Sequence, residues 1–183
     1  MRFVFLTSFF LSFASVATAT DCNTHKIYCR IVKLQPKIDK DRAMRVSNAI
    51  YKSSQEFKID PMISVAILFQ ENRFRSQHTW KTKIDVKEDC HKYTCTVITT
   101  ETKDLFDIGI AQININTAHW YGFDVDRLVN YDVEYAIHAH FKILKDKIEQ
   151  CDHLGKDAWS CYHSTTQKFR VKYITDVGRY LDE

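Results

Sequence analysis

The sequence predicts a mainly α-helical domain that carries one small, disulfide-tied β-hairpin. Two long segments, residues 39–57 and 131–150, repeat apolar residues at helical spacing with charged residues between them. A third segment, residues 78–104, instead alternates β-branched and aromatic residues with charged ones, as hairpins do. Only four Gly and two Pro occur in 183 residues, so flexible linkers are scarce and one compact domain is expected.

The N-terminus has the pattern of a secretory signal peptide. Arg2 is followed by an apolar stretch from Phe3 to Val16 and then by the small residues Ala17-Thr18-Ala19. The apolar stretch is short for a membrane span and is interrupted by Thr and Ser. We therefore expect residues 1–19 to be removed, and residues 20–183 to form a monomeric domain that is periplasmic or secreted and has no membrane attachment.

The cysteines and the charge balance fit an exported protein that does not bind nucleic acid. The chain has 26 Lys and Arg against 23 Asp and Glu, and cleavage would remove only Arg2 from these counts. This balance lacks the basic excess of nucleic-acid-binding domains, although mild basicity suits an anionic polymer. An even number of cysteines in the exported part indicates disulfides. The local pairs are Cys22–Cys29, Cys90–Cys95 and Cys151–Cys161, although the first two cysteines could instead join the last pair.

Residues 39–57 and 60–72 are expected to form two successive helices. Asp39 or Asp41 would cap the first helix. Asp60 would cap the second, with Pro61 at its first position, where the missing N–H leaves no hydrogen bond unmade. The second segment is apolar on nearly all sides, which is typical of a buried helix.

This buried helix ends on a carboxylate. In the stretch "AILFQENRF" the apolar run stops abruptly before Glu71. A carboxyl group among apolar neighbours such as Ile67 and Phe74 is unfavourable to ionise, so its pKa should rise and it could donate a proton near neutral pH. Position alone leaves an alternative, in which Glu71 forms an ion pair with Arg73 or Arg75.

The C-terminal half is expected to be helical. Residues 131–150 form an amphipathic helix, and two shorter helices are expected near 157–163 and 169–180. Histidines and cysteines gather between positions 138 and 163. His138 and His140 would nevertheless point to different faces of one helix, and the cysteines are expected to be oxidised. No metal site and no cofactor are predicted.

Three stretches in order, "AILFQENRF", "DIGIAQININTA" and "AWSCYHSTTQKFRVKYITDV", together resemble the lytic transglycosylases related to goose-type lysozyme. The family has Glu-Ser in the first motif, where this chain has Glu71-Asn72. Its Gly-Leu-Met-Gln-Ile motif corresponds to residues 109–113, and its Ala-Tyr-Asn motif to residues 161–163. The resemblance covers about residues 44–177, with the hairpin at 78–104 as an insertion.

The resemblance implies a lysozyme-like α+β fold and an enzyme of peptidoglycan. The implied reaction is non-hydrolytic cleavage between N-acetylmuramic acid and N-acetylglucosamine, with Glu71 acting first as acid and then as base and giving a 1,6-anhydro product. Gln112 and Asn114 would bind the sugar, and Tyr162, with Tyr173, would hold the Glu71 carboxyl group. His163 is assigned to substrate binding as well. Gln112 could instead cap a turn, and Tyr162 could belong to the core.

Two other functions remain open, and some residues resemble one branch of the family in particular. A hydrolytic muramidase would need a second acid; Asp107 is the candidate, and the hairpin offers Asp85, Glu88, Asp89 and Asp104. A non-catalytic peptidoglycan-binding or assembly protein would keep the groove without the chemistry. Asp107, Asn114 and the run Tyr162-His163-Ser164 are similar to the branch of transglycosylases associated with type III and type IV secretion systems. A secretion or envelope-spanning machine is therefore an implied partner, besides the glycan strands.

Overall fold

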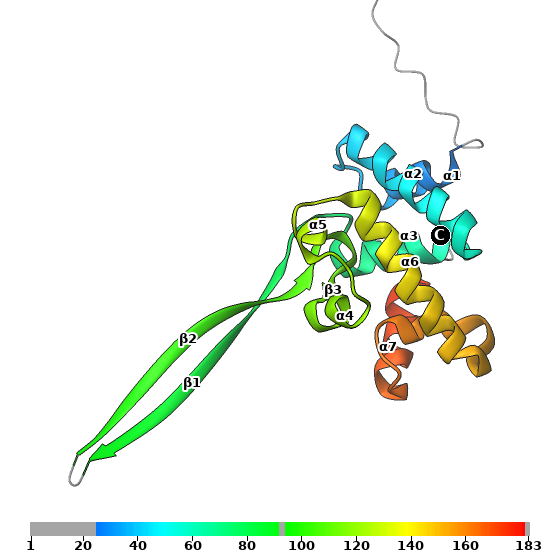
Figure 1. Ribbon diagram of the computed structural model, residues 1–183. Helices are drawn as coiled ribbons and strands as arrows, with labels where there is room; N and C mark the ends of the chain where they lie inside the picture. Colours follow the sequence, from blue (N-terminus) through cyan, green and yellow to red (C-terminus); the bar gives the residue numbers. More distant parts are fainter. Residues whose placement is uncertain (1–24, 92–93, 182–183) are drawn as a thin grey trace, which may run out of the picture.

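The computed structural model describes residues 25–91 and 94–181, which form a helical body with a long β-ribbon (Figure 1). The predicted signal peptide, residues 1–19, lies outside the described residues. In the described part no helix is both long and apolar enough to cross a membrane. In chain order the elements are α1 (Lys26–Leu34), α2 (Lys40–Phe57), α3 (Pro61–Asn72), β1 (Thr79–His91), β2 (Thr94–Ile108), the 3-10 helix η1 (Gly109–Ala111), β3 (Ile113–Asn114), α4 (Ile115–Trp120), α5 (Val125–Val129), α6 (Val133–Gln150), the 3-10 helix η2 (Asp152–Tyr162) and α7 (Gln167–Gly178).

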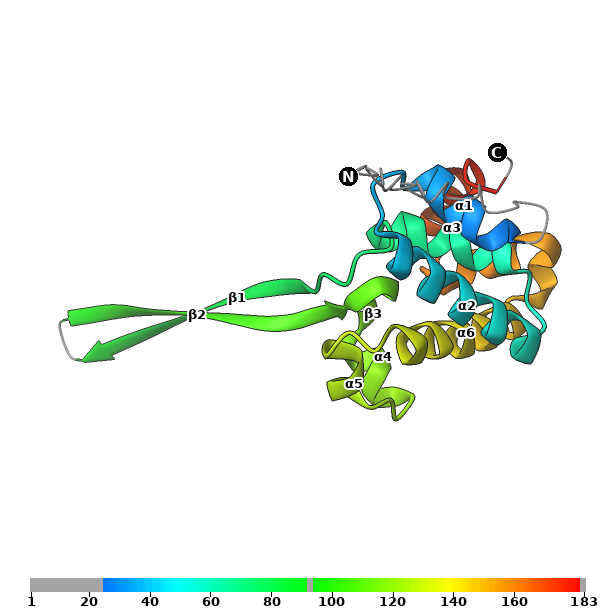
Figure 2. The same ribbon diagram turned by 90° about the horizontal axis from the view of Figure 1, so that it is seen from above.

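Helix α3 lies at the centre of the body, in contact with α1, α2, α7 and η1 (Figure 2). Its residues Ser64–Phe69 are all buried, as expected for a helix that is apolar on nearly all sides. The amphipathic helix α6 packs against α2 and η2 and buries Ile137, Phe141 and Leu144. The central position of α3 brings its C-terminal residue pair Glu71-Asn72 into contact range of segments that are distant in sequence.

Side-chain caps fix where the long helices begin. The carboxylate of Asp39 accepts a hydrogen bond from the backbone N–H of Arg42, which selects Asp39 over Asp41 as the cap of α2. Asp60 caps α3 through the N–H of Met62, with Pro61 at the first helical position as predicted. Such caps satisfy N–H groups that have no partner within the helix.

Strands β1 and β2 pair in antiparallel register and form a ribbon that extends away from the body (Figures 1 and 2). Only the base of β2 pairs with a third strand, where Asp107 and Ile108 face Asn114 and Ile113. The predicted hairpin is confirmed, although its second strand continues to Ile108, beyond the expected limit at residue 104. The register sets Cys90 opposite Cys95; their side chains lie outside the described part, so a disulfide between them stays a prediction.

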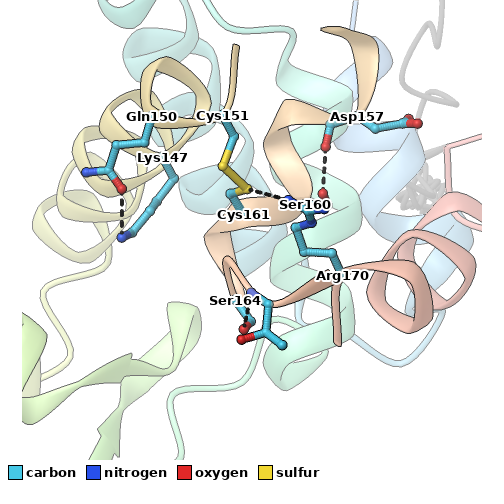
Figure 3. The surroundings of a disulfide bond; sticks show 9 residues. Lys147, Gln150, Cys151, Asp157, Ser160, Cys161, Ser164 and Arg170 are labelled. Atoms are coloured by element: carbon cyan, nitrogen blue, oxygen red, sulfur yellow. Dashed lines mark hydrogen bonds between the residues drawn. A yellow bond between two sulfur atoms is a disulfide. The ribbon is translucent and has the colours of Figure 1, made fainter. Parts of the chain in front are cut away.

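The predicted disulfide between Cys151 and Cys161 is present (Figure 3). It joins the residue after α6 to η2, so it lies in a helical region and not in the sheet. Cys29 is disulfide-bonded as well, but its expected partner Cys22 lies outside the described residues.

Helices α1, α4 and α5 were not predicted from the sequence. Ile27 and Ile31 of α1 are buried four residues apart, and this spacing was the available signal for a helix. Helices α4 and α5 have six and five residues, which is too short for a periodic pattern to emerge. Their caps, Asn114 and Asp124, were the only local signs of them.

Candidate active site

Glu71 is held in a largely apolar setting at the C-terminal end of α3. Ile67 and Leu68 on the preceding turn are fully buried, and Phe74 is nearly so. The helix ends because Arg73 and Phe74 both adopt left-handed backbone conformations, with φ of +49° and +57°. This sharp turn buries the Phe74 ring against Phe69, with 5.7 Å between the ring centroids. Within the described part of the chain, Glu71 forms no ion pair with either neighbouring arginine.

The hydroxyl of Tyr173, on α7, donates a hydrogen bond of 2.6 Å to Oε1 of Glu71. The imidazole of His163 stacks on the Tyr173 ring with 4.7 Å between centroids and 9° between planes. Burial raises the pKa of the Glu71 carboxyl group; the Tyr173 hydrogen bond and the charge of His163 lower it by less, and Asp107 adds a small further rise. The raised pKa expected from the sequence is therefore confirmed in direction and in cause, because desolvation is the largest influence.

Glu71 opens into a cavity of about 410 Å³. A second, smaller hollow of about 220 Å³ lies beside it, and both are lined by Glu71 and His163. Glu71 and His163 therefore border both hollows. The larger cavity is otherwise lined by Phe106, Asp107, Gln112, Ile113, Asn114, Thr117, Ile143 and Tyr162, and the smaller one by Gln70, Phe169, Lys172, Tyr173 and Asp176.

Asp107 lines the same cavity as Glu71, from the base of the ribbon. Nδ2 of Asn114, on the paired strand, donates to Oδ1 of Asp107 over 3.3 Å. Burial raises the pKa of Asp107, and this hydrogen bond partly offsets the rise. The carbonyl oxygen of the Asn114 side chain is engaged as the cap of α4, through the N–H of Asn116. Both residues are therefore fixed in orientation at the cavity wall.

Gln112 and Tyr162 also line the cavity, but their polar atoms are directed elsewhere. Nε2 of Gln112 donates to the carbonyl oxygens of Gln77 and Gly109, and its Oε1 accepts from Thr79. The hydroxyl of Tyr162 donates to the carbonyl oxygen of Ala111 over 3.2 Å. The resemblance implied that Tyr162, with Tyr173, holds the Glu71 carboxyl group. In this structure Tyr173 alone of the two bonds to Glu71.

The residues gathered around Glu71 lie within a segment that matches a known family. A sequence model of the family described as the transglycosylase SLT domain matches residues 48–173, more than half of the chain. The chain belongs to this family. No curated protein and no solved structure matches the chain significantly. An SLT domain indicates transglycosylase activity on the glycan strands of peptidoglycan and hence action at the cell wall.

The remaining candidate residues of this SLT domain lie away from Glu71, or their side chains are not among those that the structure describes. Asp104 is exposed, and the register places Asp85, Glu88 and Asp89 farther out along the ribbon, where side chains are not described. His138 pairs with Glu56 at the surface, whereas His140 is fully buried, so the two histidines do face different sides of α6. Cys151 and Cys161 are bonded to each other and cannot ligate a metal.

Sequence reasoning missed two features of the SLT site. The side chain of Asn72, where the family has Ser, hydrogen-bonds the carbonyl oxygens of Gln77 and Gly109 at the base of the ribbon. Its position next to Glu71 was visible in the sequence, but the partners it would reach were not. The stacking of His163 on Tyr173 was equally invisible, because it depends on how α7 folds back beside η2.

Proposed function

We propose that this SLT-domain protein is a lytic transglycosylase that cleaves the glycosidic bond between N-acetylmuramic acid and N-acetylglucosamine in peptidoglycan. One observation carries the proposal: a largely buried carboxyl group with a raised pKa, that of Glu71, opens into a cavity and has a single hydroxyl partner. A carboxyl group with a raised pKa keeps its proton to higher pH than a free one, which suits general acid catalysis on a glycosidic oxygen.

The reaction proceeds in two steps that use the same carboxyl group. Glu71 first gives its proton to the glycosidic oxygen while the bond to C1 of the muramyl residue breaks, and the substrate's own N-acetyl group stabilises the positive charge. The ionised Glu71 then takes the proton of the muramyl 6-hydroxyl as that oxygen bonds to C1. The product carries a 1,6-anhydro ring, no water is consumed, and Glu71 regains its proton.

The neighbours of Glu71 support the proposed steps. The Tyr173 hydroxyl donates to Oε1, which stabilises the carboxylate formed after proton transfer. His163 lines both hollows, so its imidazole would contact a sugar bound in either one. Asn114 would contact the sugar in the larger cavity. Gln112 lines the same cavity, where its side chain would contact the sugar while its amide stays bonded to Gln77, Gly109 and Thr79.

A hydrolytic muramidase is the second candidate, and the position of Asp107 favours it. Asp107 shares the cavity with Glu71, so an ionised Asp107 could orient or deprotonate an attacking water. The same residue could instead be structural, through its hydrogen bond with Asn114.

Mass spectrometry of the muropeptides released from purified peptidoglycan separates the candidates. We expect 1,6-anhydro ends and a loss of about 10²–10⁴-fold in rate for Glu71→Gln. Reducing ends, together with a comparable loss in Asp107→Asn, would identify a muramidase. Binding without cleavage by the wild type on several peptidoglycans would leave the non-catalytic binding protein, and full activity of Glu71→Gln would refute the catalytic assignment.

The proposal includes export and a place beside an envelope machine. The N-terminal pattern of residues 1–19 supports export to the periplasm or beyond. The motif variants at Asp107, Asn114 and Tyr162-His163-Ser164 support the secretion-associated branch. Processing near Ala19 would be detected by N-terminal sequencing of the protein recovered outside the cytoplasm.

A further inference from the structure

Two side-chain amides meet on the same pair of backbone carbonyl oxygens beside the candidate active site. Nδ2 of Asn72 donates to the oxygens of Gln77 and Gly109, over 2.9 Å in each case. Nε2 of Gln112 donates to the same two oxygens, over 2.9 and 2.7 Å. We name these four residues, Asn72, Gln77, Gly109 and Gln112, the amide clamp.

The amide clamp joins two NH₂ groups to two carbonyl oxygens. Each NH₂ group carries two hydrogens, so each can donate to both oxygens. The oxygen of Gly109 also accepts from the backbone N–H of Gln112, over 3.2 Å. All four distances fall within the range of good N–H···O hydrogen bonds. The contact of Asn72 with the oxygen of Arg75, at 3.3 Å, is the longest that this NH₂ group makes.

The amide clamp closes the base of the ribbon. Gln77 precedes β1 and Gly109 follows β2, so their carbonyl oxygens mark the points where the ribbon leaves and re-enters the body. Thr79 adds a hydrogen bond of 2.6 Å from its hydroxyl to Oε1 of Gln112. His78 accepts from the N–H of Gly109 over 3.1 Å. Entry and exit of the ribbon are therefore joined through side chains as well as through the strand ladder.

The amide clamp also connects the two carboxyl groups of the cavity. Asn72 directly follows Glu71 in α3, and Gly109 lies two residues after Asp107. A hydrogen bond between Asn72 and Gly109 thus fixes the end of the helix that carries Glu71 against the strand that carries Asp107. We propose that Asn72 is a positioning residue that, through the amide clamp, holds the Glu71 and Asp107 carboxyl groups at a fixed separation across the cavity.

Asparagine at position 72 makes contacts that a serine there could not make. A serine hydroxyl has one hydrogen and a shorter reach, so it could satisfy only one of the two carbonyl oxygens. The asparagine amide satisfies both, which suits a chain whose ribbon must be closed at its base. Loss of these bonds would leave part-buried carbonyl oxygens with fewer partners and would loosen the position of Asp107 relative to Glu71.

The kinetic test compares Asn72→Ser and Asn72→Ala with the wild type on soluble glycan strands. It rests on the proposed function. Asn48→Ala is the matched control, because Asn48 is exposed on α2, away from Glu71. We expect kcat to fall by about 10-fold or more in Asn72→Ala and by less in Asn72→Ser, with KM within about twofold, since misplacement of reacting groups affects the chemical step. Thermal melting must show both variants folded at the assay temperature.

Hydrogen exchange tests the amide clamp independently of any activity. We expect exchange of the backbone amides at the ribbon base, residues 79–81 and 104–108, to speed up by about 10-fold in Asn72→Ala and to stay unchanged in Asn48→Ala. Unchanged exchange would refute the clamp, whether or not kcat falls. Faster exchange with a wild-type kcat would refute its link to the carboxyl groups. If the wild type cleaves no glycan, the proposed function fails while the exchange result still decides whether the clamp exists.

Discussion

At the scale of single residues, Glu71 is subject to opposing influences on its protonation. Burial favours the protonated acid, whereas the Tyr173 hydroxyl and the charge of His163 favour the carboxylate. An acid that must give up its proton and later take one back needs both forms to be accessible. The hydrogen bond and the charge of His163 therefore offset part of the rise in the pKa of Glu71 that burial causes.

Removing the Tyr173 hydroxyl should shift the pH range of catalysis upward. In Tyr173→Phe the hydrogen bond to the carboxylate is lost, so the pKa of Glu71 rises further above its ordinary value. Because the general acid must be protonated, the basic limb of the profile of kcat/KM against pH moves to higher pH. Tyr51→Phe, at an exposed position on α2, is the control. A basic limb that stays in place or moves to lower pH would contradict this role of Tyr173.

His140 should make the fold sensitive to acid. The side chain is fully buried, and neither ring nitrogen has a hydrogen-bond partner among the described residues. Burial lowers the pKa of His140 to about 3, whereas in the unfolded chain it is near 6.5. Between about pH 6.5 and about pH 3 the unfolded state binds a proton that the folded state does not, so the free energy of unfolding falls by about 1.4 kcal/mol for each pH unit of acidification.

Replacing His140 with Phe isolates this contribution. The imidazole packs edge-on against the Tyr162 ring at 4.8 Å, a contact that a phenyl ring can reproduce. Urea unfolding at pH 7.5 and pH 5 should show a smaller loss of stability in His140→Phe than in the wild type. His138→Gln, on the exposed side of α6, should behave as the wild type. Equal losses in all three proteins would exclude His140 as the acid-sensitive group.

Residue roles were predictable from sequence only where they depend on local surroundings. The raised pKa of Glu71 follows from apolar neighbours in the same helix, which the sequence displays. That Tyr173 holds Glu71 while Tyr162 bonds to Ala111 depends on where η2 and α7 meet α3 and η1, which no local pattern encodes. The engagement of Gln112 with Gln77 likewise requires the ribbon to return to its starting point.

At the scale of elements, capping and periodicity account for what the sequence could predict. Helices α2, α3 and α6 have an Asp cap and a long apolar pattern, and all three were predicted with starts within two residues of those observed. Helices α4 and α5 contribute one buried residue each, Ala118 and Leu128, so tertiary contacts decide their existence. The left-handed residues Arg73 and Phe74, which end α3, carry no glycine signal in the sequence.

The disulfide between Cys151 and Cys161 should be a large part of the stability of the C-terminal elements. It closes a short loop, with a sequence separation of 10 residues, and ties η2 to the end of α6 (Figure 3). Replacing both cysteines with Ala should lower the free energy of unfolding by about 3 kcal/mol, as the chain-entropy estimate gives for such a loop. Urea denaturation measures this loss. A change below about 0.5 kcal/mol would mean that η2 is held by packing alone.

At the scale of the whole molecule, the body and the ribbon contribute differently to stability. Among the residues whose side chains are described, the main core contains Phe74 and Ile108 but no residue between them. A two-stranded ribbon is at most marginally stable alone. The alternating pattern in the sequence predicted strands at this place, but it could not show that they extend away from the body, because that depends on how the strands are placed relative to the rest of the fold (Figure 1).

A protein with a shortened ribbon should therefore keep its fold and its site. Replacing residues 82–103 with Asn-Gly leaves Lys81 opposite Asp104 as the last pair. Ten residues come off each strand, so this pair keeps the hydrogen-bonding type of His91 and Thr94, because pair types alternate along an antiparallel ladder. The cavity-lining residues Phe106 and Asp107 and the amide clamp all remain in the chain.

The free energy of unfolding of this variant should differ from that of the wild type by less than about 1 kcal/mol, since a shorter connection changes the entropy of loop closure only slightly. Its kcat on short soluble glycans should be unchanged, because the groups that contact or influence Glu71 all lie outside the deleted residues 82–103. Urea denaturation and initial-rate measurements test the two expectations separately. A loss of stability above about 2 kcal/mol would show that the ribbon supports the body, and a stable variant with a reduced kcat would show that the outer ribbon reaches the cavity.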